Sequence, residues 1–150
     1  MTPVDQLAFF SDSIIYLSVM LIPFYLWGKD RKKLFLYSLS FVAVLVSVYL
    51  IKITLAVPRP DLALIPMPAT PSFPSMHASL GLLPAGFFFH LKKYKVSLLV
   101  YGSLIAYSRV LLGVHYWTDI FAGAVIGFLI PLAIFYKKEK VLKFFRLDKK

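Results

Sequence analysis

The sequence contains no cysteine among its 150 residues, which excludes a disulfide framework, a thiol nucleophile and a zinc site built on sulfur. Charged residues are also scarce, at 16% compared with about a quarter in ordinary soluble domains. Hydrophobic residues, in contrast, make up 59% of the chain. This composition excludes a disordered chain, a collagen-like chain and an ordinary soluble domain, and it indicates an integral membrane protein.

Apolar stretches that are long enough, or nearly long enough, to cross a bilayer occur five times: at residues 8–27, 34–57, 76–91, 96–112 and 119–136. They lack the alternation of barrel strands, so we expect an all-α helical bundle that forms one transmembrane domain over residues 1–150. The first stretch has no basic residue before Lys29 and no clear cleavage site. We therefore expect a retained helix rather than a signal peptide.

The distribution of basic residues predicts the orientation of the bundle. Four lie between the first two stretches, three between the third and fourth, and seven after the fifth, which leaves three of the seventeen. With five spans these regions share one side, which the positive-inside rule makes cytoplasmic. The net charge of +10 therefore indicates topology and not a nucleic-acid partner. We expect a plasma (inner) membrane protein whose N-terminus is extracytoplasmic, and whose basic tail, 137–150, contacts inner-leaflet lipid or is simply solvated.

The three remaining cations are Lys52, Arg59 and Arg109, all at the outer ends of predicted helices. A cation near membrane depth is costly unless it is paired or lines a wet cavity. One such residue would be equally consistent with a snorkelling anchor or an ion pair to Asp61 or Asp119. Three on one face favour an anion-binding site.

Lys52 and Arg59 are separated by seven residues, close to two helical turns, so both side chains would point roughly the same way. Pro58 makes that alignment approximate. Six of the ten prolines fall within residues 58–74, which we interpret as an ordered outer loop; a plain linker is the alternative. A lysine and an arginine on one face suit a phosphate group.

Ser75 and His77 lie where the proline-rich loop meets the third apolar stretch. Ser75 is a natural N-cap, which places His77 in the first helical turn. A helix N-terminus offers free N–H groups to an anion, and a histidine there could protonate a departing oxygen. The alternative is an ordinary cap beside an interfacial histidine.

Ser108 and Arg109 end the fourth stretch, and Gly113 permits a turn before His115 and Asp119. If the next helix starts early, His115 and Asp119 are neighbours at i and i+4. A carboxylate on one ring nitrogen fixes the tautomer and leaves the other nitrogen as a nucleophile. A buried structural hydrogen bond is the alternative.

Together these residues closely resemble the three signature motifs of the type 2 phosphatidic acid phosphatase family, the membrane branch of the acid phosphatase and vanadium haloperoxidase superfamily. The motifs read K-x6-R-P, P-S-G-H and S-R-x5-H-x3-D, and they correspond to residues 52–60, 74–77 and 108–119. One position departs, because Met76 replaces the usual glycine. The family's membrane members also commonly have six spans, whereas five are predicted here.

The resemblance implies a metal-independent and cofactor-independent lipid phosphatase with its active site at the outer membrane face. In such enzymes the residue matching His115 attacks phosphorus to form a phosphohistidine, oriented by the one matching Asp119. The residue matching His77 protonates the leaving group. Phosphate is bound by the residues matching Lys52, Arg59, Ser75, Met76 (through its backbone N–H), Ser108 and Arg109.

Several alternatives stay open at this point. The family's substrates include polyprenyl diphosphate, phosphatidylglycerophosphate, phosphatidic acid and lipid A 1-phosphate, and the sequence does not choose among them. A zinc site of His77, His115 and Asp119 ranks below the phosphatase because three cations would repel a metal ion. A non-catalytic lipid-phosphate binder or transporter is the alternative function.

The sequence also leaves open the oligomeric state of the protein and the location of one acidic residue, Asp12. Gly123 and Gly127 permit close helix contact, more plausibly within the bundle than in a dimer, so we expect a monomer or a weak homodimer. Asp12 is expected at the interface, although an approach to the site stays open.

Overall fold

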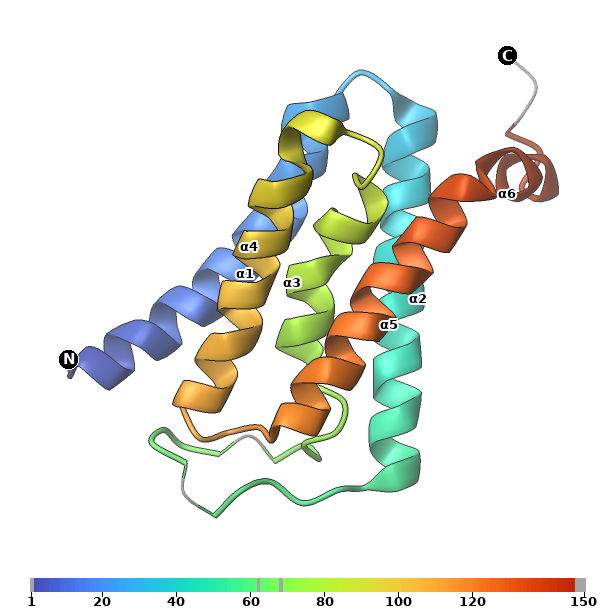
Figure 1. Ribbon diagram of the computed structural model, residues 1–150. Helices are drawn as coiled ribbons and strands as arrows, with labels where there is room; N and C mark the ends of the chain where they lie inside the picture. Colours follow the sequence, from blue (N-terminus) through green and yellow to red (C-terminus); the bar gives the residue numbers. More distant parts are fainter. Residues whose placement is uncertain (1, 62, 68, 148–150) are drawn as a thin grey trace.

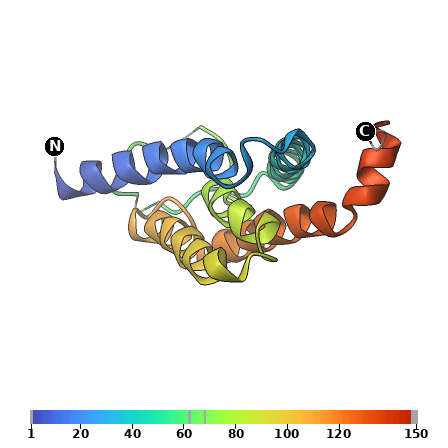
Figure 2. The same cartoon turned by 90° about the horizontal axis from the view of Figure 1, so that it is seen from above.

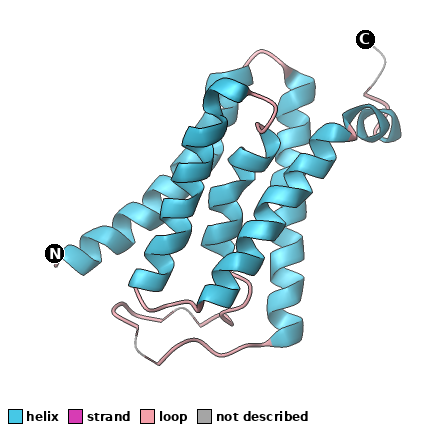
Figure 3. Cartoon of the chain, viewed as in Figure 1, coloured by secondary structure: helices cyan, strands magenta, loops and turns pink. Residues whose placement is uncertain are grey.

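The computed structural model describes residues 2–61, 63–67 and 69–147, and in that part of the chain it contains helices and no strands (Figures 1 and 3). The side chains of residues 10, 11 and 27 also lie outside the description. The helices of the described part are α1 Pro3–Trp27, α2 Arg31–Leu55, α3 Met76–Phe87, α4 Lys92–Leu111, α5 Trp117–Tyr136 and α6 Lys138–Phe144. The predicted all-α bundle is confirmed. Residues 148–150 of the predicted basic tail lie outside the described residues.

Helix α3 lies at the centre of the bundle, with α1 and α2 on one side and α4 and α5 on the other (Figure 2). Every residue from Ala78 to Phe87 is buried. The helix has only 12 residues, which at about 1.5 Å per residue is shorter than the roughly 30 Å hydrocarbon core of a bilayer. Because its residues are buried, the longer helices α1, α2, α4 and α5 must enclose it.

Small residues allow α5 to pack directly on the backbone of α3. A Cβ atom at Gly123 would overlap the carbonyl oxygen of Ser75, and one at Gly127 would overlap the carbonyl oxygen of Ser79. The two glycines are four residues apart and share one face of the helix. They thus serve packing inside the bundle, and they fix the start of α5 against the start of α3.

Three of the helices are long and apolar enough to cross a membrane: Pro3–Leu26, Arg31–Leu55 and Trp117–Tyr136. The sequence predicts five crossings, with α3 and α4 as the other two. Helix α4 begins with Lys92, Lys93 and Lys95, and α3 is short, so neither reaches the same length and hydropathy. The number of crossings stays a prediction, but the membrane-spanning helices establish an integral membrane protein.

The described residues of the loop 56–75 lie together with the loop 112–116 at one end of the bundle, at the bottom of Figure 1. Ala56 ends α2 in a left-handed conformation with φ of 46°, and Gly113 makes the turn after α4 with φ of 68°. Hydrogen bonds tie the proline-rich loop to the segments that follow α2 and α4. The N–H of Ser72 donates to Val57 O at 2.8 Å, and the N–H of Leu64 donates to Leu112 O at 3.0 Å. These hydrogen bonds anchor the loop to the ends of α2 and α4.

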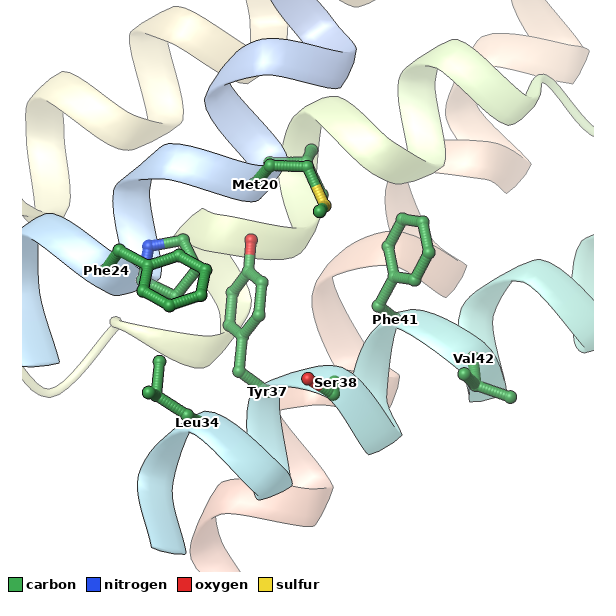
Figure 4. Close-up of a pocket in the computed structure, with 9 residues that line it drawn as sticks. Met20, Phe24, Leu34, Tyr37, Ser38, Phe41 and Val42 are labelled. Atoms are coloured by element: carbon green, nitrogen blue, oxygen red, sulfur yellow. The ribbon is translucent and has the colours of Figure 1, made fainter. Parts of the chain in front are cut away.

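A cavity of about 330 Å³ lies between α1 and α2, toward the opposite end of the bundle. Figure 4 shows apolar side chains around it, including Met20, Phe24 and Phe41, with the ring of Tyr37 among them. Within the described residues, the buried hydroxyl of Tyr37 has no hydrogen-bond partner. None of the predicted site residues lines this cavity.

Candidate active site

Lys52 is held at the end of α2 by the proline-rich loop. Its side chain is buried, and its Nζ donates to the carbonyl oxygens of Pro71 at 2.6 Å and Ser72 at 3.0 Å. Both carbonyls lie just before α3, so the ammonium group lies beside the start of that helix. An ammonium has three donors, and two of them are used here.

Arg59 reaches the same region from the loop rather than from a helix. Helix α2 ends at Leu55, since Pro58 cannot continue it, so the predicted alignment of Lys52 and Arg59 by helical turns is wrong. The guanidinium is instead fixed by the loop: Nε donates to Thr70 O at 2.9 Å, and Nη1 donates to Val114 O at 2.8 Å. These bonds join the proline-rich loop to the segment that holds His115.

His115 and Asp119 form a buried pair, with Nδ1 and Oδ2 3.2 Å apart. Helix α5 begins at Trp117, so the histidine precedes the helix, and the i and i+4 contact forms across the helix start. The same Oδ2 accepts the N–H of Tyr116 at 2.9 Å, which fixes the carboxylate. When Nδ1 donates to Asp119, Nε2 keeps a lone pair, and this atom lies 3.4 Å from Arg59 Nη1.

The start of α3 supplies the next part of the site. Ser75 is the N-cap, as the sequence predicts; its hydroxyl faces the N–H of Ala78 at 3.4 Å. Its own N–H donates to Asp119 O at 3.0 Å, which couples the starts of α3 and α5. His77 lies in the first turn, and Met76 packs its side chain against the core. The backbone N–H groups of this first turn are those that a helix leaves for a ligand.

Arg109 and Ser108 come from the last turn of α4, and both are buried. The Ser108 hydroxyl donates back to Ile105 O at 2.7 Å. Arg109 Nη1 lies 2.8 Å from Asp12 Oδ1, on α1. The same carboxylate oxygen lies 2.8 Å from Nε2 of His77.

Asp12 is the residue that the sequence favours at the interface, with an approach to the site left open. Its side chain is half-buried and bridges two of the predicted site residues, so α1 contributes to the site. The available signal was a lone acidic residue within an apolar stretch, but nothing in its spacing relates it to His77 and Arg109, which lie 65 and 97 residues further along.

The electrostatics of the site favour a neutral His115. Burial, followed by the nearby charges of Arg59 and Lys52, lowers the pKa of His115 to about 2. Burial and then the charge of Arg109 hold the pKa of Arg59 below its usual range, although a guanidinium stays charged. The site therefore combines three cations with a neutral imidazole whose Nε2 lies beside the Arg59 guanidinium.

These parts can bind a tetrahedral oxyanion and place a nucleophile beside it. The cations and the helix N-terminus would neutralise phosphoryl oxygens, as phosphoryl transfer requires. Within the described segments, no group of three or more His, Cys, Asp and Glu side chains lies close enough to hold a metal ion, which includes the zinc set considered from the sequence. An all-α membrane bundle with this site is the arrangement expected of a membrane phosphatase.

Comparison with known proteins also points to a membrane phosphatase. The profile of the PAP2 superfamily matches residues 31–143. Undecaprenyl-diphosphatase BcrC from Bacillus subtilis (strain 168) is 30% identical over 131 residues, which cover 82% of this chain and 68% of that protein. The crystal structure of a transmembrane PAP2-type phosphatidylglycerolphosphate phosphatase from Bacillus subtilis superposes with a TM-score of 0.76 at 23% identity, covering 96% of this chain and 81% of the other. The chain belongs to the PAP2 superfamily and is a phosphoric ester hydrolase.

Proposed function

We propose that this protein removes phosphate from a membrane lipid phosphate or diphosphate through a phosphohistidine at His115. The observation that supports this most is the pairing of His115 Nδ1 with Asp119, which leaves Nε2 facing the Arg59 guanidinium among three cations. Binding alone would not require an oriented imidazole. A polyprenyl diphosphate is the first substrate to test, because BcrC is an undecaprenyl-diphosphatase; phosphatidylglycerophosphate, phosphatidic acid and lipid A 1-phosphate are the others.

The proposed reaction has two steps. In the first, His115 Nε2 forms a bond to phosphorus while the bond to the leaving oxygen breaks, and that oxygen takes a proton from His77. The products are the dephosphorylated lipid (a lipid monophosphate when the substrate is a diphosphate) and a phosphohistidine. In the second step water attacks phosphorus, His77 takes the proton from the water, and the bond to His115 breaks to release inorganic phosphate.

The remaining side chains stabilise charge. Lys52, Arg59 and Arg109 are assigned to the phosphoryl oxygens, where fixed cations act most strongly in a water-poor site. Ser75 and Ser108 are assigned supporting hydroxyl contacts, and the N–H of Met76 a backbone contact. The side chains thus supply the charge neutralisation that the transition state needs.

The site is proposed to face outward, in a protein of the plasma (inner) membrane with a cytoplasmic C-terminus. The basic segments 29–33, 92–95 and 137–147 all lie at the bundle end opposite the site, which suits the positive-inside rule. A lipid phosphate of the outer leaflet would then lie at the depth of the site. The protein is proposed to act as a monomer or a weak homodimer.

Inorganic phosphate release by detergent-purified protein tests this proposal. The assay presents each of the four lipids in the presence of EDTA to wild type, His115→Ala and, as a matched histidine control, His90→Ala. His90 lies at the opposite end of the bundle and is exposed. We expect release by wild type and the control, and none by His115→Ala.

The outcomes separate two functions. Full activity of His115→Ala contradicts the phosphohistidine step. Lipid binding without release from any of the four lipids favours the alternative, a non-catalytic lipid-phosphate binder or transporter that uses the same cationic pocket.

A further inference from the structure

The carboxylate of Asp12 contacts two residues of the proposed machinery, although it lies on α1, outside the segment 31–143 that the superfamily profile matches. We propose that Asp12 is a positioning residue that stabilises the protonated form of His77 and fixes the His77 imidazole relative to the Arg109 guanidinium. The inference rests on the proposed function, in which His77 donates the proton to the leaving oxygen. Asp12 itself does not need to touch the substrate.

The packing of α1 directs Asp12 into the site. Ile15 and Val19 are three and seven residues further along and are buried in the core, so Asp12 shares their inward face. The hydroxyl of Ser18 forms a hydrogen bond with the hydroxyl of Tyr101, which joins α1 to α4. The helix is thus held on both α3 and α4, the two elements that supply His77 and Arg109.

A single oxygen makes both contacts. Oδ1 of Asp12 lies 2.8 Å from Nε2 of His77 and 2.8 Å from Nη1 of Arg109. The side chain of Arg109 is 3% exposed and that of His77 18%, whereas that of Asp12 is 47% exposed. The carboxylate therefore remains hydrated on one side while it orders two mostly buried groups on the other.

The charges around His77 explain why it needs such a partner. Arg109 from α4 and Arg59 from the loop carry positive charges near His77, the centroid of the Tyr16 ring lies 6.4 Å from that of His77, and His115 lies close to it as well. In the described part of the chain, Asp12 is the carboxylate in contact with His77, since Asp119 is paired with His115. A carboxylate at this distance stabilises the imidazolium form that an acid catalyst requires.

Asp12 neither gains nor loses a proton in the two proposed steps. The imidazolium of His77 gives its proton to the leaving oxygen as the bond from phosphorus to that oxygen breaks. His77 is then neutral and takes a proton from the water that attacks the phosphohistidine. Asp12 stays a carboxylate throughout, and it stabilises the imidazolium form of His77 before the first step and after the second.

The test is Asp12→Asn, which keeps the shape and removes the charge, measured against two phosphate monoesters. An alkyl lipid phosphate has a strongly basic leaving oxygen that needs the proton, whereas the leaving oxygen of 4-nitrophenyl phosphate departs without it. We expect kcat/KM for the lipid to fall about 10- to 100-fold and kcat/KM for 4-nitrophenyl phosphate to change less than about threefold, because this ratio reports only the steps up to formation of the phosphohistidine. The alkaline limb of the lipid pH profile should move to lower pH, and Asp12→Glu should restore part of the rate.

Asp5→Asn is the matched control, since it removes the same charge from the same helix two turns before Asp12, and we expect wild-type kinetics for both esters. Equal losses of Asp12→Asn on both esters, or an unchanged lipid pH profile, would overturn the positioning role. A higher kcat/KM in Asp12→Asn would also overturn it, because the carboxylate would then compete with the substrate. If the proposed function itself fails, either wild type releases no phosphate from any lipid or the lipid turnover of His115→Ala is unchanged, and both outcomes differ from all of these.

Discussion

Replacing Asp119 by asparagine isolates the charge of this carboxylate from its hydrogen bonds. Oδ2 of Asp119 accepts both from Nδ1 of His115 at 3.2 Å and from the N–H of Tyr116 at 2.9 Å. An asparagine oxygen in the same position accepts both, so it preserves the tautomer of His115 and the start of α5. Asp119→Ala removes the hydrogen bonds as well.

The magnitude follows from the charge that develops on the nucleophile. As His115 bonds to phosphorus its ring becomes positive, among three cations and beside this one carboxylate. A unit charge pair at about 4 Å is worth about 4 kcal/mol at an effective dielectric constant of about 20, which is roughly a 1,000-fold rate effect for full charge development. We expect kcat of Asp119→Asn to fall about 100- to 1,000-fold, and that of Asp119→Ala to fall further.

Initial rates of phosphate release at saturating lipid check this prediction. Asp61→Asn is the matched control, since Asp61 is an exposed carboxylate on the proline-rich loop, and its rate should stay at the wild-type value. The thermal midpoint of Asp119→Asn should also fall. Oδ1 of Asp119 is buried without a partner in the described structure, and an amide group there would lack an acceptor. If Asp119→Asn retains more than a tenth of the wild-type kcat, the electrostatic reasoning is refuted.

Three further predictions concern stability and topology. In the unfolded protein, His115 takes up a proton below its ordinary pKa of about 6.5, whereas in the folded protein, where its pKa is about 2, it does not. The thermal midpoint should therefore fall on acidification from pH 7 to 5.5, and it should fall less in His115→Gln. Gly127→Val should lower the thermal midpoint strongly, since its Cβ meets a backbone oxygen, whereas Ala133→Val on the exposed face should not; equal midpoints would contradict the packing. A cysteine introduced at Ala69 should react with an impermeant thiol reagent in intact cells and one at Lys137 only after permeabilisation; the reverse pattern would invert the topology.

The fold was predictable where local rules determine it. Hydrophobic length predicts the long helices α1, α2 and α5, Ser75 is a typical N-cap, and Gly113 adopts the positive φ that its turn requires. The short α3 was harder to predict, because its apolar run continues to Leu91 while the helix ends at Phe87. Burial by four neighbours, which sequence does not reveal, allows such a short helix at the centre.

The site was predictable where its residues are close in sequence, as for His115 and Asp119. The route by which Arg59 reaches them was not, because its side chain is held across a loop by hydrogen bonds that it donates to the carbonyl oxygens of Thr70 and Val114. Asp12 depends entirely on tertiary packing: the tilt and contacts of α1 bring it to His77, and no motif spacing encodes that approach.

The stereochemical course at phosphorus tests the central claim most directly. A phosphate monoester that is chiral by oxygen isotopes is turned over in the presence of glycerol, and the configuration of the transferred phosphoryl group is determined. Two successive in-line displacements, with the phosphoryl group held on His115 between them, predict retention of configuration. Inversion would show direct transfer in one step and would contradict the phosphohistidine account.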